Sequence, residues 1–260
     1  MASLRVATYN IHHGTDIRRR PSLDRITAAL TALEPDIAGL QEVDSRYGPR
    51  SDWADQPAEL AAALGATPLF GPTIPNDEGG YGIAILTRFP VESHRFIPLP
   101  TKDTEEDRGA LHALLTTPDG PLHVVNTHLN HLPWDGAGRA RQLAVIGDLI
   151  AKVRAETPAP VVLTGDFNAP PGRSELIPVR DVLNDGWKTV HGGPRWLSWL
   201  LARAPGGTFP SVWPVRRIDY VFATPEYSAV ATTIPRTRAS DHRPLAVDLR
   251  LTGGTEPHPR

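Results

Sequence analysis

Ser240-Asp241-His242-Arg243-Pro244 is the last of several polar clusters that lie where β-strands are expected to end. Apolar, strand-type runs precede the earlier clusters, at residues 4–9, 36–40, 122–125 and 161–165. The polar residues concerned are Asn10, Glu42, His128, Asp166, Asn168, Asp219, Asp241 and His242. Four carboxylates, two amides and two imidazoles carried to one rim of a sheet predict a metal-dependent hydrolytic site.

The size of the chain favours one large α/β domain. Its 260 residues are 40% hydrophobic, which is enough to bury a full core, and two small domains are the alternative. The candidate polar residues run from Asn10 to His242, so a site that uses them all needs both ends of the chain folded together. We therefore predict a single domain over residues 1–252, followed by a disordered tail at 253–260.

Charge and cysteine content limit the partners and the metal ligands. The 27 Lys and Arg against 29 Asp and Glu give a formal net charge of −2, which does not indicate a strongly basic nucleic-acid binder. A nuclease stays compatible with this balance, because a local groove of arginines can hold phosphate. The absence of cysteine excludes disulfides and thiolate ligands, so oxygen or imidazole must hold any metal.

No targeting or membrane-spanning segment is recognisable. The first ten residues run directly into a strand and lack the apolar core of a secretory signal, so a cytoplasmic protein is expected. No apolar run approaches the roughly 20 residues that cross a bilayer.

Hydrophobic periodicity predicts strand clusters interrupted by a few helices. Leu23, Ile26, Leu30 and Leu33 have helical spacing, and Pro35 ends that helix. The further helices are expected at 57–64 and 137–156, and the further strands at 81–86, 91–99, 108–116, 122–127, 161–165, 218–222 and 244–251. Without a regular βαβ rhythm, this order predicts two mixed sheets packed face to face with helices outside.

Three motifs carry the expected chemistry. Strand alternation would point Asp166 and Asn168 to the same side of a strand, and an Asp-x-Asn turn is the alternative interpretation of this motif. Glu42 at a strand end offers the hard oxygen ligand that Mg²⁺ or Mn²⁺ needs, although a solvated strand terminus explains it too. A carboxylate can fix the tautomer of His242, and spacing does not decide whether Asp219 or Asp241 does so.

The ordered motifs resemble those of the endonuclease/exonuclease/phosphatase superfamily. They are Thr8-Tyr9-Asn10-Ile11-His12-His13-Gly14, Gly39-Leu40-Gln41-Glu42-Val43-Asp44, Asn126-Thr127-His128-Leu129, Gly165-Asp166-Phe167-Asn168, Arg217-Ile218-Asp219-Tyr220-Val221 and the 240–244 stretch. The resemblance covers residues 4 to 250. It implies a four-layered α/β sandwich like that of deoxyribonuclease I, and it does not specify the substrate.

The resemblance also implies roles for individual residues. Glu42 would be the principal Mg²⁺ (or Mn²⁺) ligand, with Asn10 and Asp241 near the metal. Asp219 would orient His242, which would act as the base or as the charge facing the phosphate. The remaining implied roles are nucleophile positioning and transition-state stabilisation by Asp166 and Asn168, contact with the scissile phosphate by His128 and Tyr81, and phosphate binding by Arg108.

The chain departs from two relatives at specific positions. Abasic-site endonucleases have an acidic residue two positions after the first asparagine, where this chain has His12. In deoxyribonuclease I a glutamate just after the tyrosine pairs with the counterpart of His128, whereas here Gly82 and Ile83 follow Tyr81. A different orientation of His128 is therefore expected.

Residues 191–209 lie outside these motifs. Trp196–Leu201 holds two tryptophans and three leucines, which would either rim the site and contact an apolar substrate or lipid surface, or form a short helix that caps the core. His12, His13, His131 and Trp134 would either line the cleft or lie on ordinary surface.

The expected function is hydrolysis of a phosphodiester by a Mg²⁺- or Mn²⁺-dependent enzyme. A phosphomonoesterase acting on a small phosphorylated metabolite or lipid headgroup is the alternative within the same class. A catalytically inactive binding module is the alternative from another class, and the intact set of motifs argues against it.

Overall fold

The computed structural model describes residues 3–102, 106–192 and 205–252, which form two six-stranded mixed sheets. The first sheet has the order β11 (Tyr227–Thr233), β12 (Leu245–Leu251), β1 (Leu4–Asn10), β2 (Ile37–Ser45), β4 (Gly80–Thr87) and β3 (Thr67–Pro75). The second has the order β5 (Val91–Leu99), β6 (Arg108–Thr117), β7 (Gly120–His128), β8 (Val161–Asp166), β10 (Asp219–Ala223) and β9 (Asn184–Asp185).

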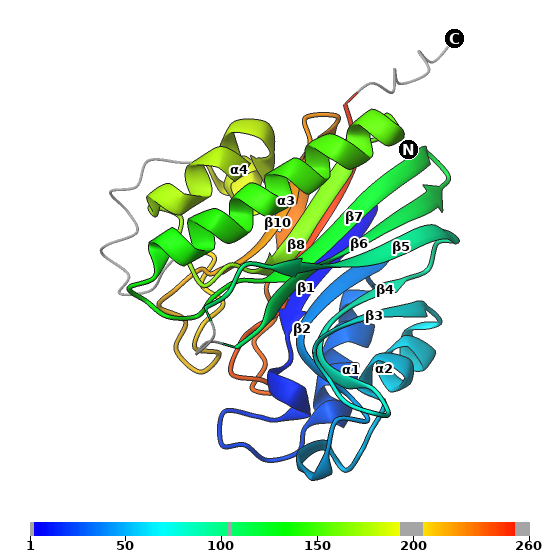
Figure 1. Cartoon of the computed structure of the whole chain (residues 1–260), viewed down its shortest axis with the longest axis vertical. Coiled ribbons are helices and arrows are strands. Elements are labelled where there is room, and N and C mark those ends of the chain that lie inside the picture. The colour runs from blue at the N-terminus through cyan, green and yellow to red at the C-terminus, as the bar shows by residue number, and fades with distance from the viewer. Residues whose placement is uncertain (1–2, 103–105, 193–204, 253–260) are drawn as a thin grey trace.

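Helices cover the outer faces of the two sheets (Figure 1). Helices α1 (Leu23–Leu33) and α2 (Gln56–Leu64) lie against the first sheet, and α3 (Gly136–Glu156) and α4 (Ile177–Val182) lie against the second. The remaining helices are short: α5 (Gly186–His191) and the 3-10 turns η1 (His12–Gly14), η2 (Pro49–Ser51) and η3 (Ser174–Leu176). The predicted four-layered α/β sandwich is therefore confirmed.

Three apolar clusters hold the four layers together. Ile83, Leu111 and Val124 belong to the cluster between the sheets, where side chains of both inner faces meet. Leu143 and Ile146 of α3 pack on the outer face of the second sheet, and α1 and α2 bury their apolar stripes on the first. Burial of these side chains supplies most of the stabilisation of the fold.

Strands β3, β9 and β11 and helices α4 and α5 were not expected from the sequence. Strand β3 contains three prolines, and β11 consists mostly of half-buried and exposed residues. Both lie at edges of the first sheet, where a missing N–H and a polar face are tolerated, so neither carries the apolar run of a central strand. Helices α4 and α5 are too short, at six residues each, to show a clear period in a proline- and glycine-rich stretch.

Trp196–Leu201 lies outside the described residues, so its contribution to a rim or a core stays a prediction. Among the residues that the structure describes, no helix combines the length and the apolar character needed to cross a membrane.

The strand register places the polar motifs at one end of the sandwich. Strands β1 and β2 are parallel, as are β7 and β8, so the carboxyl ends within each pair lie together. In the second sheet His128 pairs with Asp166, and Asp166 pairs with Asp219 of the antiparallel strand β10. Three candidate site residues are thus brought side by side by backbone pairing alone.

A buried asparagine joins the two sheets next to this end. The Asn126 side-chain amide on β7 donates to the carbonyls of Leu40 (2.8 Å) and Ala84 (2.9 Å) in the other sheet, and its oxygen accepts from Gln41 (2.7 Å). The sheets approach closely here, because a Cβ on Gly39 would lie 2.1 Å from Thr164 Oγ1. The amide therefore fixes how β7 sits relative to β2 and β4.

Asn126→Ala should lower the free energy of unfolding by roughly 3–5 kcal/mol, because it leaves a cavity and several buried polar groups without partners. Urea denaturation measures this loss. Asn184→Ala, at an exposed position of β9, is the matched control and should change stability little. A loss below about 1 kcal/mol would show that water replaces the amide and that the link is not structural.

Candidate active site

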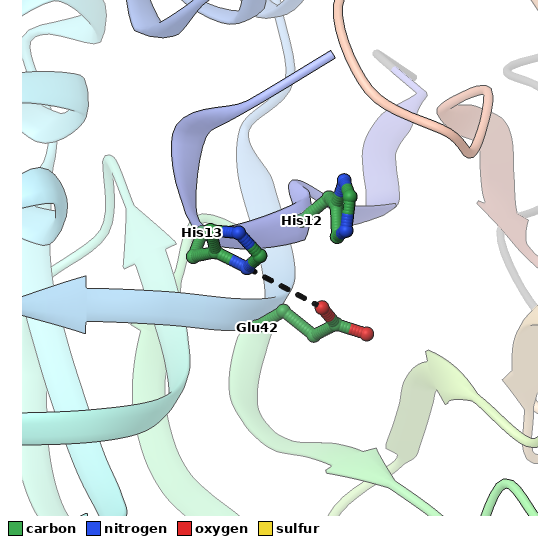
Figure 2. Close-up of side chains that lie close together, drawn as sticks. All are labelled: His12, His13 and Glu42. Atoms are coloured by element: carbon green, nitrogen blue, oxygen red, sulfur yellow. Dashed lines mark ion pairs between the residues drawn. The ribbon is translucent and has the colours of Figure 1, made fainter. Parts of the chain in front are cut away.

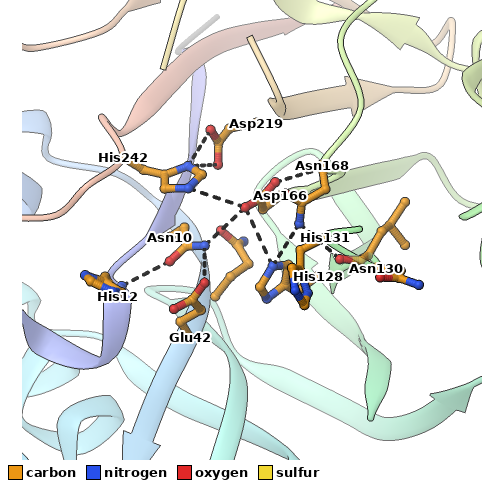
Figure 3. A network of polar contacts seen from close by, with 12 residues as sticks. Asn10, His12, Glu42, His128, Asn130, His131, Asp166, Asn168, Asp219 and His242 are labelled. Atoms are coloured by element: carbon orange, nitrogen blue, oxygen red, sulfur yellow. Dashed lines mark hydrogen bonds and ion pairs between the residues drawn. The ribbon is translucent and has the colours of Figure 1, made fainter. Parts of the chain in front are cut away.

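The candidate residues from both sheets meet in one polar network (Figure 3). Asn10 comes from β1, Glu42 from β2, His128 from β7 and Asp166 from β8. The loop before β12 adds His242. Contacts between the two sheets close the network, because Asn10 Nδ2 donates to both Glu42 Oε1 (2.9 Å) and Asp166 Oδ2 (3.1 Å).

Glu42 lies within a strand, not at a strand end as expected. Strand β2 continues to Ser45, and a β-bulge interrupts its pairing with β4 between Gln41 and Val43. Glu42 occupies the bulge with a φ of +54°, a conformation rarely adopted by residues with a Cβ. The bulge inserts an extra residue, which turns the Glu42 side chain out of the strand toward His13 (Figure 2).

Asn10 acts as a donor toward both carboxylates. Its side-chain oxygen accepts the backbone N–H of His12 (3.0 Å), and that bond leaves the amide nitrogen facing Glu42 and Asp166. Metal ligation by Asn10 stays a prediction, and would require its oxygen to face the ion instead.

Asp166 and Asn168 meet through a turn and not through strand alternation. Strand β8 ends at Asp166, and the Asn168 backbone N–H donates to Asp166 Oδ1 (2.9 Å). Asn168 then takes a φ of +50°, which asparagine tolerates better than most residues. The turn directs the Asn168 amide back over the end of β7, where it donates to the carbonyl of Leu129 (3.1 Å).

Asp219 is the carboxylate that orients His242. His242 Nδ1 lies 2.9 Å from Asp219 Oδ2, and its Nε2 faces Asp166 Oδ2 at 3.6 Å. Burial alone would lower the pKa of His242, but the carboxylates of Asp219 and Asp166 raise it above its ordinary value. Burial and the Asp219 charge in turn raise the pKa of Asp166. The site therefore holds a charged imidazole between two buried acids.

His128 has a cationic neighbour where deoxyribonuclease I has a glutamate. Arg108 Nη1 lies 3.1 Å from His128 Nδ1, and Asn168 Nδ2 lies 3.2 Å from His128 Nε2. Burial and then the Arg108 charge hold the pKa of His128 well below its usual value, so the ring is neutral. An arginine donor thus contacts this histidine, and its different orientation from that relative stays a prediction.

Arg108 itself is a buried cation at the edge of the network. It pairs with Glu106 (2.7 Å) through Nη1 and contacts His131 Nδ1 (3.1 Å) through Nη2. Its guanidinium thus links two histidines of the same loop region, which sequence spacing did not indicate. Nothing in this geometry tests its predicted contact with phosphate.

Tyr81 lies at the start of β4, close to Glu42. Burial and then the Glu42 charge raise the pKa of its hydroxyl, so Tyr81 remains a neutral donor. Its ring packs under Arg50, whose guanidinium carbon lies 5.0 Å from the ring centroid. Arg50 is in turn held by the buried Asp44 (2.6 Å).

The donor chemistry of the site fits a divalent cation. Within the described ranges, two groups of three ligating side chains have donor atoms within 4.8 Å of one another: His12, His13 and Glu42, and Asp166, Asp219 and His242. In the second group His242 is already charged and ion-paired. The first group adjoins Asp241, which lies 3.9 Å from His12 Nδ1, so Glu42 and Asp241 flank the same two histidines.

Sequence reasoning missed the residues that position the site. Gln41 and Asn126 link the sheets, and each lies inside a motif that was quoted for its neighbour. Asn126 precedes His128 by two positions on one strand, so alternation could have placed it on the same inner face. No sequence signal distinguished His12 and His13 from surface residues.

Comparison with known proteins places this geometry in a family. The sequence model of the Endonuclease/Exonuclease/phosphatase family matches residues 7–242. YbhP of Escherichia coli (strain K12) is 28% identical over 262 residues, covering 96% of this chain and 97% of YbhP. An endonuclease/exonuclease/phosphatase from Beutenbergia cavernae superimposes with a TM-score of 0.74 at 28% identity, covering 97% of this chain and 72% of that one.

A second solved structure shares the fold at lower identity. The mannosyl-6-phosphatase Bt3783 of Bacteroides thetaiotaomicron superimposes with a TM-score of 0.78 at 19% identity, covering 96% of this chain and all of the other, 100%. This likeness confirms the architecture alone.

In the metal-free protein, His242 should carry protons on both ring nitrogens at pH 7.5, because a raised pKa extends the charged form to higher pH. Asp219→Asn removes the nearer carboxylate and should lower that pKa. Two-dimensional ¹H–¹⁵N NMR of the histidine rings between pH 6 and 9 measures both states. Asp148→Asn, an exposed position on α3, should leave the titration unchanged, and an equal shift in both variants would contradict the pairing.

Proposed function

The chain belongs to the endonuclease/exonuclease/phosphatase family, and we propose that it is a divalent-metal-dependent phosphoesterase that hydrolyses a phosphodiester by water attack at phosphorus. The convergence of Glu42, Asp166, His128 and His242 in one network carries this proposal. These residues come from two sheets and from both halves of the chain. In-line displacement at phosphorus needs charge stabilisation on one side and an aligned water on the other, and the two sides of the network supply them.

On the cation side, Glu42 and Asp241 would hold Mg²⁺ or Mn²⁺, with Asn10 beside them. When bound, the ion neutralises charge on the non-bridging phosphate oxygens. Asn10 donates to Glu42 and Asp166 at once, so it sets the spacing between the cation side and the water side. A substrate phosphate would lie between these two sides.

On the water side, Asp166 would orient the nucleophile. Its carboxylate Oδ2 also faces His128 Nε2 at 3.6 Å, and the same oxygen faces His242 Nε2. The buried, raised-pKa acid can accept a proton from water as attack proceeds, while His242 offers an N–H to the phosphate. Asn168, His128 and Tyr81 add neutral donors, which favour the more charged transition state.

A phosphomonoesterase is the second candidate, and the cation Arg108 favours it. A buried guanidinium with His131 beside it suits the extra charge of a terminal phosphate, and the acidic net charge gives no support to long nucleic-acid partners. Hydrolysis of bis-p-nitrophenyl phosphate, p-nitrophenyl phosphate, plasmid DNA, RNA and phospholipids, each with Mg²⁺ and with Mn²⁺, separates the two candidates. Turnover of monoesters alone would overturn the diesterase proposal.

Chelation should abolish hydrolysis, and added Mg²⁺ or Mn²⁺ should restore it, because water has to attack an anionic phosphate without a protein nucleophile. Glu42→Gln keeps the side-chain shape and removes a ligand charge, so metal affinity should fall while the melting temperature stays close to wild type. Isothermal titration with each metal measures this change. Full activity in excess EDTA, or an unchanged titration in Glu42→Gln, would contradict the assignment.

Asp166→Asn and His242→Ala should each reduce turnover by roughly 10²–10⁴-fold, as is typical of groups that move or hold a proton in the transition state. The double variant should reduce turnover by less than the product of the two single reductions, since the two side chains interact. Initial rates and circular dichroism of all three variants test this. Near-normal turnover in either single variant would assign the role to His128 instead.

A further inference from the structure

Two adjacent histidines that this mechanism does not use lie against Glu42 (Figure 2). His13 Nδ1 is 3.9 Å from Glu42 Oε2, and the two imidazole rings lie 4.5 Å apart between centroids. The side chains of His12, His13 and Glu42 are 17%, 16% and 22% exposed, so a small ion reaches them from solvent. Each residue offers a ligand atom, and these atoms lie within 4.8 Å of one another.

The backbone at all three positions is held in the left-handed region. The φ angles are +48° at His12, +45° at His13 and +54° at Glu42, although none of the three is glycine. Such conformations cost of order 1 kcal/mol or more each and persist where the surrounding structure enforces them. Two separate segments, the turn η1 and the bulge in β2, thus bend unfavourably to aim three ligating side chains at one point.

Thr15 sets the direction of the ring nitrogens. When its hydroxyl donates to the carbonyl of His12 (2.9 Å), its oxygen is left to accept from His13 Nε2 (3.4 Å) and His12 Nδ1 (3.2 Å). A proton on His13 Nε2 leaves the lone pair of Nδ1 facing the Glu42 carboxylate. Two electron-rich atoms facing each other 3.9 Å apart repel, and a cation between them removes that repulsion.

We infer that His12, His13 and Glu42 form a site of two imidazoles and one carboxylate that binds a first-row transition-metal ion in preference to Mg²⁺. This inference rests on the divalent-cation requirement of the proposed function, and it names the class of ion. Mg²⁺ is a hard ion that favours oxygen ligands and keeps several waters, whereas imidazole is a good ligand for transition metals.

The spacing fits such an ion after a small adjustment. Neighbouring ligands on one side of an ion, each bonded at about 2.1 Å, lie roughly 3.0–3.4 Å apart. The observed donor atoms lie within 4.8 Å of one another, so each side chain needs to move toward the ion by roughly 1 Å. The three side chains occupy one side of the ion and leave the other side for water or a substrate oxygen.

Metal-free full-length protein is titrated with Mn²⁺, and free Mn²⁺ is followed by electron paramagnetic resonance while Mg²⁺ is added as a competitor. Displacement of half the bound Mn²⁺ should need more than about a 100-fold excess of Mg²⁺. Pulsed spectra of the bound ion should show ¹⁴N couplings from the imidazoles.

His12→Asn and His13→Asn remove the imidazoles with a residue that accepts a positive φ. Each should lower the required excess of Mg²⁺ by roughly 10-fold or more and weaken the ¹⁴N couplings. His94→Gln, an exposed position on β5, is the control and should change neither. If an asparagine variant fails to fold, His13→Gly, which carries no penalty at this φ, takes its place.

Absent ¹⁴N couplings, or an Mn²⁺ to Mg²⁺ preference that both variants leave unchanged, would overturn the inference and show that the histidines only lie beside Glu42. The proposed function fails separately. Bound Mn²⁺ with ¹⁴N couplings but without hydrolysis of any phosphoester would support this metal site and contradict the proposed phosphoesterase function. Metal-dependent hydrolysis without ¹⁴N couplings would support the phosphoesterase function and contradict this metal site.

Discussion

The hydrogen bonds that Asn126 makes across the sandwich are the constraint on which the site depends. The site is divided between two sheets, and apolar packing between sheets does not by itself determine how far one slides along the other. Asn126 holds the carbonyls of Leu40 and Ala84, and it holds Gln41, the residue before Glu42. The same strand ends in His128, two residues later. A shift of one sheet along the other would therefore break buried hydrogen bonds before it separated Glu42 from His128. The fold thus determines the spacing between these two residues.

The charges in the site favour a bound cation. Asp166 and Asp219 face each other across paired strands, with His242 as the charged group between them, while Glu42 and Asp241 lie on the other side. His128 contributes no charge, because burial and then the Arg108 charge hold its pKa well below the usual value. Carboxylates thus dominate the centre of the network, and an anionic phosphate would be repelled from it. A bound divalent ion reverses this balance on the side of Glu42.

The sequence predicted the architecture well because the central strands are apolar runs with clear ends. Strand β5 was predicted at its observed bounds, and the long helix α3 within one residue. Strand β3 was not predicted, because an edge strand needs no apolar run. The bulge at Glu42 was not predicted, because a shift of strand register does not change the hydrophobic pattern of the sequence. The motifs contain residues that the structure brings into one network, but the partner of each residue comes from a distant segment. The contact of Asn10 with Asp166, for example, joins β1 of one sheet to β8 of the other, which only the fold supplies.

Several residues of the network have strained backbone conformations. His12, His13, Glu42 and Asn168 all have positive φ, and all lie at the end of the sandwich where the motifs meet. Each costs of order 1 kcal/mol, and glycine at these positions would relieve most of that cost. Glycine would also remove the carboxylate, the amide or the imidazole that the turn aims into the network. The three apolar clusters between the four layers stabilise the fold enough to hold these conformations. The side chains at this end are therefore explained by what they contact, since their backbone conformations oppose folding.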